Sequence, residues 1–184
     1  MSTPAGRPRV ICHMATSVDG RIVVDGWPAE SAAAVRREYE AVHASFAADG
    51  WICGRVTMEP FAGGLRAEAE VAREYRGDAP REDFRAPGDH RAFAFAVDPR
   101  GRLAWATNEI DGDHVVAVLS ERTPDEYLAF LRGRGVSYLL AGAEEVDLSL
   151  ALAKIGATFG VRTLMLEGGG GSTAGCCARG WSTR

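Results

Sequence analysis

Six short apolar runs recur along this 184-residue chain, and longer polar or helix-like segments separate them. The runs are Val10–Met14, Trp51–Cys53, Ala92–Val97, Val115–Leu119, Val136–Leu140 and Val161–Glu167. Short runs without alternation are typical of strands buried on both faces of a parallel sheet. Parallel strands need long crossovers, and the intervening segments leave room for helices. The pattern therefore predicts one α/β domain with a mostly parallel sheet and helices on both faces.

Three of the intervening segments carry helix signals. Ser31 can cap a helix whose apolar positions follow at helical spacing. These positions are Val35, Tyr39, Val42 and Phe46. Thr123, followed by a proline, predicts the start of a second helix that ends at Gly133 or Gly135. Asp147 can cap a third helix that runs to Phe159. By contrast, residues 63–91 are polar, and we expect a surface excursion there with one helical stretch over 67–75.

Composition excludes several classes of function. The net charge is −4, whereas nucleic-acid-binding proteins show clustered lysine and arginine. No apolar run approaches the ~20 residues that cross a bilayer. Residues 1–8 lack the apolar core of a signal peptide, which predicts a disordered N-terminus and a cytoplasmic protein. Cys12 and Cys53 lie in apolar runs, as buried free thiols do in a reducing compartment. The spacing of cysteine and histidine predicts no metal site.

The last apolar run ends in an acidic residue and four glycines. Leu166 and Glu167 are followed by Gly168 to Gly171. Glycine lets the backbone approach a ligand closely, so that main-chain N–H groups can face phosphate oxygens. An alternative is a tight turn with no ligand. The glycines are nevertheless the strongest candidate in the chain for contact with a phosphorylated molecule.

Residues 172–184 have no core periodicity, and we interpret them as an out-of-frame tail. GC-rich codons chosen for this segment, when read one base earlier, encode an amphipathic string typical of a helix start. The alternative is a natural short tail. The expected domains are therefore 1–8, a domain over 9–171 that is incomplete at its end, and the tail 172–184. Sequencing the coding DNA tests this expectation, and an intact frame through Arg184 would contradict it.

Five segments, taken in order, resemble one family. They read HMATSVDGRI at 13–22, GRVTME at 54–59, VLS at 118–120, GVSYLLAG at 135–142 and LEGGG at 166–170. They resemble the dihydrofolate reductase-like reductases, specifically the RibD C-terminal reductase domain of the bifunctional riboflavin-biosynthesis enzyme and its stand-alone relatives. The resemblance extends over about residues 9–171 and weakens across 60–92. Family members continue past the glycines with a helix and further strands, so the resemblance implies that these elements are missing here.

The resemblance implies an NADPH-dependent reductase. The implied substrate is 5-amino-6-(5-phosphoribosylamino)uracil, with hydride transfer to the ribosyl C1′ giving the ribityl product. Two alternatives remain open at this point. One alternative is a paralogue that reduces another small heterocycle or carbonyl compound, and the other is an inactive truncated fragment. The resemblance also implies a homodimer for the full-length protein, with no nucleic-acid or membrane partner.

The resemblance assigns cofactor contacts to residues after three of the strands. They are Gly54, Arg55, Thr57, Ser120, Gly168, Gly169 and Gly170, and we add Arg122 for its charge. A guanidinium offers a planar fork for phosphate, and a threonine hydroxyl with helix N–H groups adds donors. The alternative is a set of solvated arginines beside a capping threonine.

The resemblance places four further residues near the substrate. Asp19 and Glu167 are the implied catalytic acids, and His13 and Ser17 are the implied substrate contacts. Asp19 could equally belong to a simple Asp-Gly turn, and His13 could be a core histidine. The bifunctional enzymes carry a lysine at the position of His13, and an Asp-Asn-Pro stretch where this chain has residues 61–64. Both departures leave the substrate and its phosphate site open.

Overall fold

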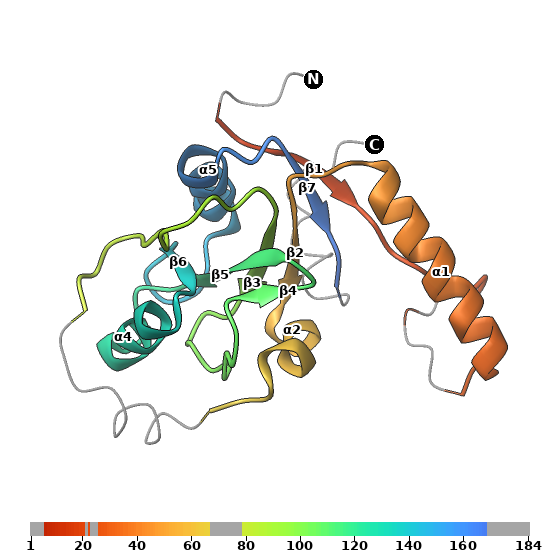
Figure 1. Cartoon of the computed structure of the whole chain (residues 1–184), viewed down its shortest axis with the longest axis horizontal. Helices are drawn as coiled ribbons and strands as arrows, with labels where there is room; N and C mark the ends of the chain where they lie inside the picture. The colour runs from red at the N-terminus through yellow and green to blue at the C-terminus, as the bar shows by residue number, and fades with distance from the viewer. Residues whose placement is uncertain (1–5, 21, 23–25, 67–78, 169–184) are drawn as a thin grey trace.

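The computed structural model describes residues 6–20, 22, 26–66 and 79–168. Within these ranges the chain alternates strands and helices (Figure 1). The strands are β1 (Arg9–Cys12), β2 (Gly50–Gly54), β3 (Phe93–Val97), β4 (Glu109–Ile110), β5 (Asp113–Leu119), β6 (Ser137–Leu140) and β7 (Thr163–Leu166). The helices are α1 (Ala29–Ser45), α2 (Arg55–Ala62), α4 (Asp125–Arg134) and α5 (Leu148–Phe159). The expected tail 172–184 lies outside the described residues.

The strands form one sheet in the order β1-β7-β2-β3-β5-β4, with β6 also paired to β5. Every pairing is parallel except that of the short strand β4 with β5. The last described strand, β7, lies between β1 and β2, so the chain returns across the sheet to fill a gap between its first two strands. The predicted mostly parallel α/β sheet is confirmed.

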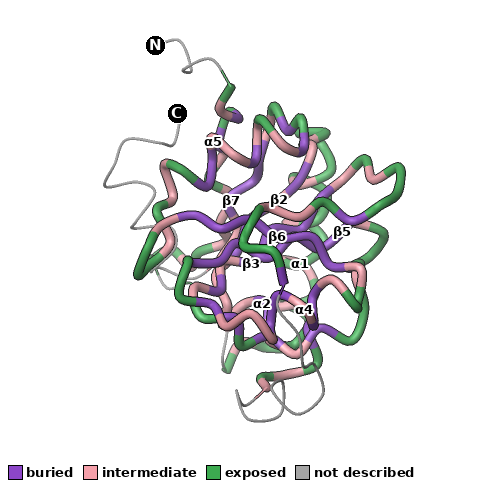
Figure 2. Tube along the Cα trace, turned by 90° about the vertical axis from the view of Figure 1, so that its left-hand side faces the viewer, coloured by how far each residue is buried: buried purple, intermediate pink, exposed green. Residues whose placement is uncertain are grey.

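Two apolar cores cover the two faces of the sheet. On one face, α2 and α4 pack through Met58, Ala62, Tyr127 and Leu131 against alternate strand residues. On the other face, α5 packs through residues such as Ile155 against the remaining strand residues. Figure 2 shows the strands as the most continuously buried part of the chain. Helices on both faces are therefore confirmed, as expected for crossovers between parallel strands.

Of two predicted N-cap residues, Asp147 caps its helix and Thr123 does not. Asp147 caps α5 by accepting hydrogen bonds from Ser149 N–H at 2.8 Å and Leu150 N–H at 3.2 Å. The predicted Thr123 cap is wrong. The N-cap of α4 is Pro124, without a side-chain cap bond, because the Thr123 hydroxyl donates to the Pro99 carbonyl at 3.3 Å.

Helix α1 is the least buried helix of the described chain. It lies beyond the β1 edge of the sheet (Figure 1), and none of its residues is buried. The predicted apolar stripe is present, but Val42 and Phe46 are each 43% exposed. Its start also differs from the prediction, because Pro28 and not Ser31 is the N-cap residue. Packing therefore contributes less to this helix than its sequence pattern predicts.

The predicted surface excursion over 63–91 is only partly a surface segment. Residues 67–78, including the predicted helical stretch, lie outside the described residues. The part that follows packs against the body, where Ala79 and Ala86 are buried and Phe84 pairs with Tyr138 of β6. The sequence does not predict this packing, because small and aromatic residues spaced within a polar stretch give no periodic signal.

The N-terminal boundary lies slightly earlier than expected. Residues 1–5 are outside the described ranges, but Pro8 is buried. The Gly6 backbone lies against Gly156 of α5, where a Cβ atom would not fit. Ordered packing therefore begins before residue 9.

Among the described helices, none is both long and apolar enough to span a membrane.

A buried histidine at the start of β5, His114, is stacked on a second histidine, His90. The ring of His114 is stacked on that of His90 with centroids 3.7 Å apart, and its residue is 3% exposed. Its Nε2 lies 2.7 Å from the Ser137 hydroxyl, which also accepts the Ala86 N–H. Burial, with the nearby His90 and Arg85, lowers the pKa of His114 to about 4. The native protein therefore holds this imidazole neutral.

This lowered pKa predicts a loss of stability in mild acid. The unfolded chain protonates His114 near pH 6.5, whereas the folded chain resists until about pH 4. The stabilisation present above pH 6.5 is therefore lost as the pH falls through this window, by roughly 2–3 kcal/mol. We expect the free energy of unfolding, measured in urea, to fall from pH 7 to pH 4 by that much more in wild type than in His114→Gln. Equal losses in both proteins would contradict the assignment.

Candidate active site

The register of three neighbouring strands brings the predicted residues His13 and Glu167 together. Backbone hydrogen bonds of 3.0 Å run from His13 N–H to the Leu166 carbonyl and from Glu167 N–H to the Ile52 carbonyl. They extend the pairings of β7 with β1 and β2 by one residue. His13, Glu167 and Cys53 are therefore neighbours in one row at the carboxyl ends of three strands, and their side chains share a face of the sheet.

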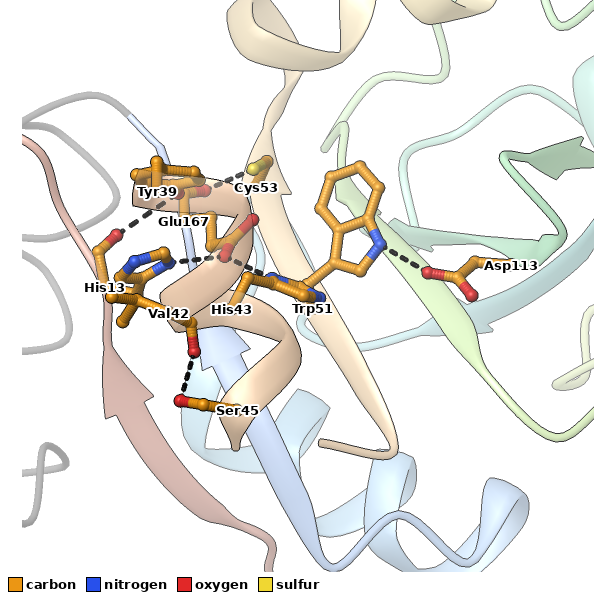
Figure 3. Close-up of polar contacts among 9 residues, drawn as sticks. All are labelled: His13, Tyr39, Val42, His43, Ser45, Trp51, Cys53, Asp113 and Glu167. Atoms are coloured by element: carbon orange, nitrogen blue, oxygen red, sulfur yellow. Dashed lines mark hydrogen bonds and ion pairs between the residues drawn. The ribbon is translucent and has the colours of Figure 1, made fainter. Parts of the chain in front are cut away.

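Two imidazoles share one carboxylate oxygen in this row. Glu167 Oε1 lies 2.8 Å from His13 Nδ1 and 2.7 Å from His43 Nδ1 (Figure 3). The side chains of His13 and Glu167 are 10% and 12% exposed, and that of His43 is 35% exposed. An ionised carboxylate only accepts hydrogen bonds, so each imidazole presents an Nδ1–H to it. The structure thus joins one predicted catalytic acid, one predicted substrate contact and a third residue from α1.

Tyr39 and Cys53 surround this carboxylate with protonated groups. The Tyr39 ring is stacked on that of His13, with centroids 3.9 Å apart, and its hydroxyl donates to the His13 carbonyl at 3.4 Å. Burial and then the negative charge of Glu167 raise the pKa of Tyr39. The same two causes raise the pKa of the Cys53 thiol to about 12, and Cys53 Sγ donates to the Glu167 carbonyl. Both groups therefore stay neutral near pH 7.

Glu167 lines one end of a cavity of about 400 Å³ on the α2 side of the sheet. The lining residues are Tyr39, Glu40, His43, Trp51, Cys53, Thr57, Phe61, Ile110, Asp111, Asp113, Glu167 and Gly168. Trp51 Nε1–H donates to Asp113 Oδ2 at 2.8 Å and so fixes one wall. Four of the lining residues are acidic, and none of the described lining residues is lysine or arginine. The cavity therefore favours neutral or cationic groups over anions.

A second feature beside the cavity fits a phosphorylated cofactor. Gly54 is the N-cap of α2, and no side chain caps the first N–H groups of this helix. Gly168 lies beside it, since an ideal Cβ there would be 3.7 Å from Gly54 N. Arg55 Nη1 is 3.7 Å from Glu59 Oε2, too far for a hydrogen bond, and Thr57 lines the cavity. Open helix N–H groups, a bare backbone and a guanidinium are suitable donors for phosphate.

Two of the other predicted cofactor contacts, Ser120 and Arg122, have partners elsewhere in the fold. Ser120 is fully buried, with its hydroxyl donating to the Pro99 carbonyl at 2.6 Å. The exposed Arg122 forms an ion pair with Glu144. Gly169 and Gly170 lie outside the described residues. For all four, a contact with the cofactor stays a prediction, and the Ser120 hydroxyl has an internal bonding role that the sequence does not indicate.

Ser17 and Asp19 form a local turn in the loop after β1. The Ser17 hydroxyl donates to Asp19 Oδ1, and Gly20 N–H donates to the Ser17 carbonyl at 2.9 Å. Neither residue lines the cavity beside Glu167. The turn alternative considered for Asp19 is therefore present, and a role for either residue in catalysis or substrate binding stays a prediction.

Sequence reasoning missed His43 and the role of Tyr39. Both were assigned to a helix, and Tyr39 was placed on its core face. Their spacing of four residues puts them on one side of α1, which was a usable signal. Nothing local to the sequence, however, indicates that this side of α1 faces the ends of β1 and β7.

Comparisons with known proteins identify the family. The family model described as the RibD C-terminal domain matches residues 8–180. The chain belongs to the RibD C-terminal domain family. This membership confirms the resemblance read from the sequence and supports an oxidoreductase. The match ends inside the segment 172–184, which was expected to lie out of frame. No curated protein sequence matches this chain significantly.

Solved structures show the same fold at low sequence identity. The riboflavin biosynthesis reductase of Saccharomyces cerevisiae aligns with a TM-score of 0.55 and 15% identity, covering 97% of this chain and 70% of its own. A pyrimidine reductase-like protein of Corynebacterium diphtheriae gives a TM-score of 0.57 and 13% identity, covering 95% and 71%. Acinetobacter baumannii RibD gives 0.56 and 17%, covering 97% of this chain but 44% of its own. The dihydrofolate reductase-like fold predicted from the sequence is therefore confirmed.

The raised pKa of Cys53 predicts an unreactive thiol. A pKa of about 12, against a usual value of 9.0, leaves roughly 1000-fold less thiolate near pH 8. We expect iodoacetamide to modify the exposed Cys12 of the folded protein long before Cys53. Peptide mass spectrometry over time measures both sites, and denatured protein provides the control in which both react. Equal rates in the folded protein would be inconsistent with the burial of this thiol.

Proposed function

We propose that this protein is an NADPH-dependent reductase that acts on a small molecule in the cytoplasm. One observation carries the proposal in a chain of this family: a corner whose donors suit phosphate lies directly beside an acidic cavity. Gly54, Gly168 and the N-terminus of α2 form the corner, and Glu167 connects it to the cavity. Ligands of parallel α/β sheets bind outside the carboxyl ends of the strands, which is where both features lie.

The corner would hold the phosphates of the cofactor. Arg55 contributes a guanidinium, Thr57 contributes a hydroxyl, and the first turn of α2 contributes main-chain N–H groups. When bound, NADPH supplies the hydride. The protein contributes position, exclusion of water and a local supply of protons. The groups of this site that can hold or transfer a proton are the imidazoles of His13 and His43, both bonded to Glu167.

The first candidate substrate is the one the family suggests, 5-amino-6-(5-phosphoribosylamino)uracil. Hydride addition at the ribosyl C1′, drawn as an open-chain imine, gives the ribityl product. The yeast relative is named a riboflavin biosynthesis reductase, which supports this chemistry. Glu167 and the two imidazoles would face the reacting part of the substrate and orient it.

A second candidate is a reductase of an unphosphorylated heterocycle or carbonyl compound. The composition of the cavity favours it, because four acidic residues and no described lysine or arginine line the space. His13 also stands where the bifunctional relatives carry a lysine, and it is bonded to Glu167. A phosphate dianion would meet repulsion in this cavity, whereas a neutral ring would not.

Binding of NADPH tests the proposed cofactor. We expect saturable quenching or enhancement of NADPH fluorescence, with weaker binding of NADH. Arg55→Gln should reduce NADPH affinity by roughly 10- to 100-fold, the size of a lost hydrogen bond to a charged group. Arg37→Gln is the matched control, because Arg37 lies on α1 with a side chain 73% exposed. If Arg55→Gln binds NADPH as tightly as wild type does, the corner is not the phosphate site.

Turnover separates the two candidate substrates. NADPH oxidation is followed with the phosphorylated ribosylaminouracil and with its dephosphorylated form. The first candidate predicts a higher kcat/KM for the phosphorylated compound. The second predicts no such preference, since the cavity offers no described cation for the phosphate. Binding of NADPH without turnover of either compound would reject the first candidate and leave the second.

A further inference from the structure

We propose that His13, His43 and Glu167 bind one divalent first-row transition-metal ion. Each of the three residues offers one ligand atom, an imidazole nitrogen or a carboxylate oxygen, and these atoms all lie within 4.8 Å of one another. Each of the three side chains points toward the same small region (Figure 3), and two of them, His43 and Glu167, line the cavity. Two imidazoles and one carboxylate form a common donor set for zinc and for non-haem iron.

In the absence of an ion, the ligand atoms of both histidines are at hydrogen-bonding distance from that of Glu167. Glu167 Oε1 lies 2.8 and 2.7 Å from the two Nδ1 atoms. Ligands of a tetrahedral ion with bonds of 2.0–2.1 Å lie about 3.3 Å apart. An opening of roughly half an ångström in each of these two pairs would therefore admit an ion in place of the two shared hydrogens. Rotation of the Glu167 and His43 side chains can supply this change, and His43 is 35% exposed and lies on a peripheral helix.

The sheet fixes the backbone of two of the three ligands. His13 follows β1 directly, and its ring is stacked on Tyr39. Glu167 follows β7 directly, and its main chain bonds to Ile52 and Cys53. Ligands whose backbone belongs to a sheet and whose rings are packed lose little freedom when an ion binds. His43, one helical turn from Tyr39, completes the set from α1.

The charge of the cavity also favours a cation. Glu167 supplies one negative charge to the ion directly. Glu40, Asp111 and Asp113 line the same cavity, and no described lysine or arginine opposes them. A cavity with one sign of charge raises the local concentration of the opposite ion. Because His43 and Glu167 line the cavity, the remaining coordination positions would face it, as in metal sites that accept a substrate.

The donor set argues against magnesium and calcium. Both ions prefer oxygen ligands, whereas two of the three donors here are imidazole nitrogens. If the proposed reductase function holds, an ion at this site would act as a Lewis acid on the carbonyl oxygen or imine nitrogen of the substrate. Metal binding itself does not depend on that function.

Isothermal titration with Zn²⁺ tests the site in the full chain. The background carries Cys12→Ser, Cys176→Ser and Cys177→Ser, so that no thiol other than the buried Cys53 can bind the ion. We expect one saturable site per chain. His43→Gln and Glu167→Gln should each weaken it by more than about 100-fold, since even supporting residues around a metal cost 10- to 100-fold. Titration with Co²⁺ should give visible absorption bands of a nitrogen- and oxygen-ligated ion, and these bands should be lost in both variants.

Two control variants make the result specific. Glu40→Gln removes an acid of the same cavity, and His90→Gln removes a histidine elsewhere, so both should keep the site. Circular dichroism melts establish that each variant is folded. The proposal is overturned if the folded triple-serine background binds no Zn²⁺ saturably, or if Glu167→Gln binds it equally well. The three residues would then be only a hydrogen-bonded cluster. Metal binding without NADPH binding would reject the reductase and retain the ion site.

Discussion

The insertion of β7 between β1 and β2 is the constraint on which the candidate site depends. These three strands are far apart in the sequence, and only the return of the chain across the sheet makes them neighbours. Their parallel register then fixes which residues meet where the strands end. His13, Glu167 and Cys53 become a row because each lies at the same level near the carboxyl end of its strand. In a parallel sheet such a row faces the edge where ligands bind.

The same insertion joins two chemically different environments. Toward α2, the bare backbone of Gly54 and Gly168 and the uncapped helix N–H groups form a positive corner. Toward α1 and the β4–β5 turn, the carboxylates of the cavity create a negative one. Glu167 lies at the boundary, and burial together with its charge raises the pKa of both Tyr39 and Cys53. A phosphorylated cofactor and an unphosphorylated substrate would each find a compatible half.

The sequence predicts most of the fold because its signals are local. Apolar runs and the Asp147 cap depend on neighbouring residues, so the strands and α5 agree with expectation. The two-residue strand β4 and the packing of Phe84 on Tyr138 carry no periodic signal, and neither was expected. For the site, the family resemblance brought His13 and Glu167 together. His43 is separated from Glu167 by 124 residues, and no spacing rule for metal ligands extends that far. This is also why the sequence predicts no metal site.

The position of α1 and the geometry of the site support each other. No residue of α1 is buried, so its apolar face contributes little of the free energy that holds the helix in place. The contacts of Tyr39 with His13 and of His43 with Glu167 are therefore a substantial part of its attachment. A ligand that replaces the bond between His43 and Glu167 must either bridge the two residues or release the helix. An ion or a substrate that bridges them keeps α1 in place, so binding at this site and the position of α1 are thermodynamically coupled.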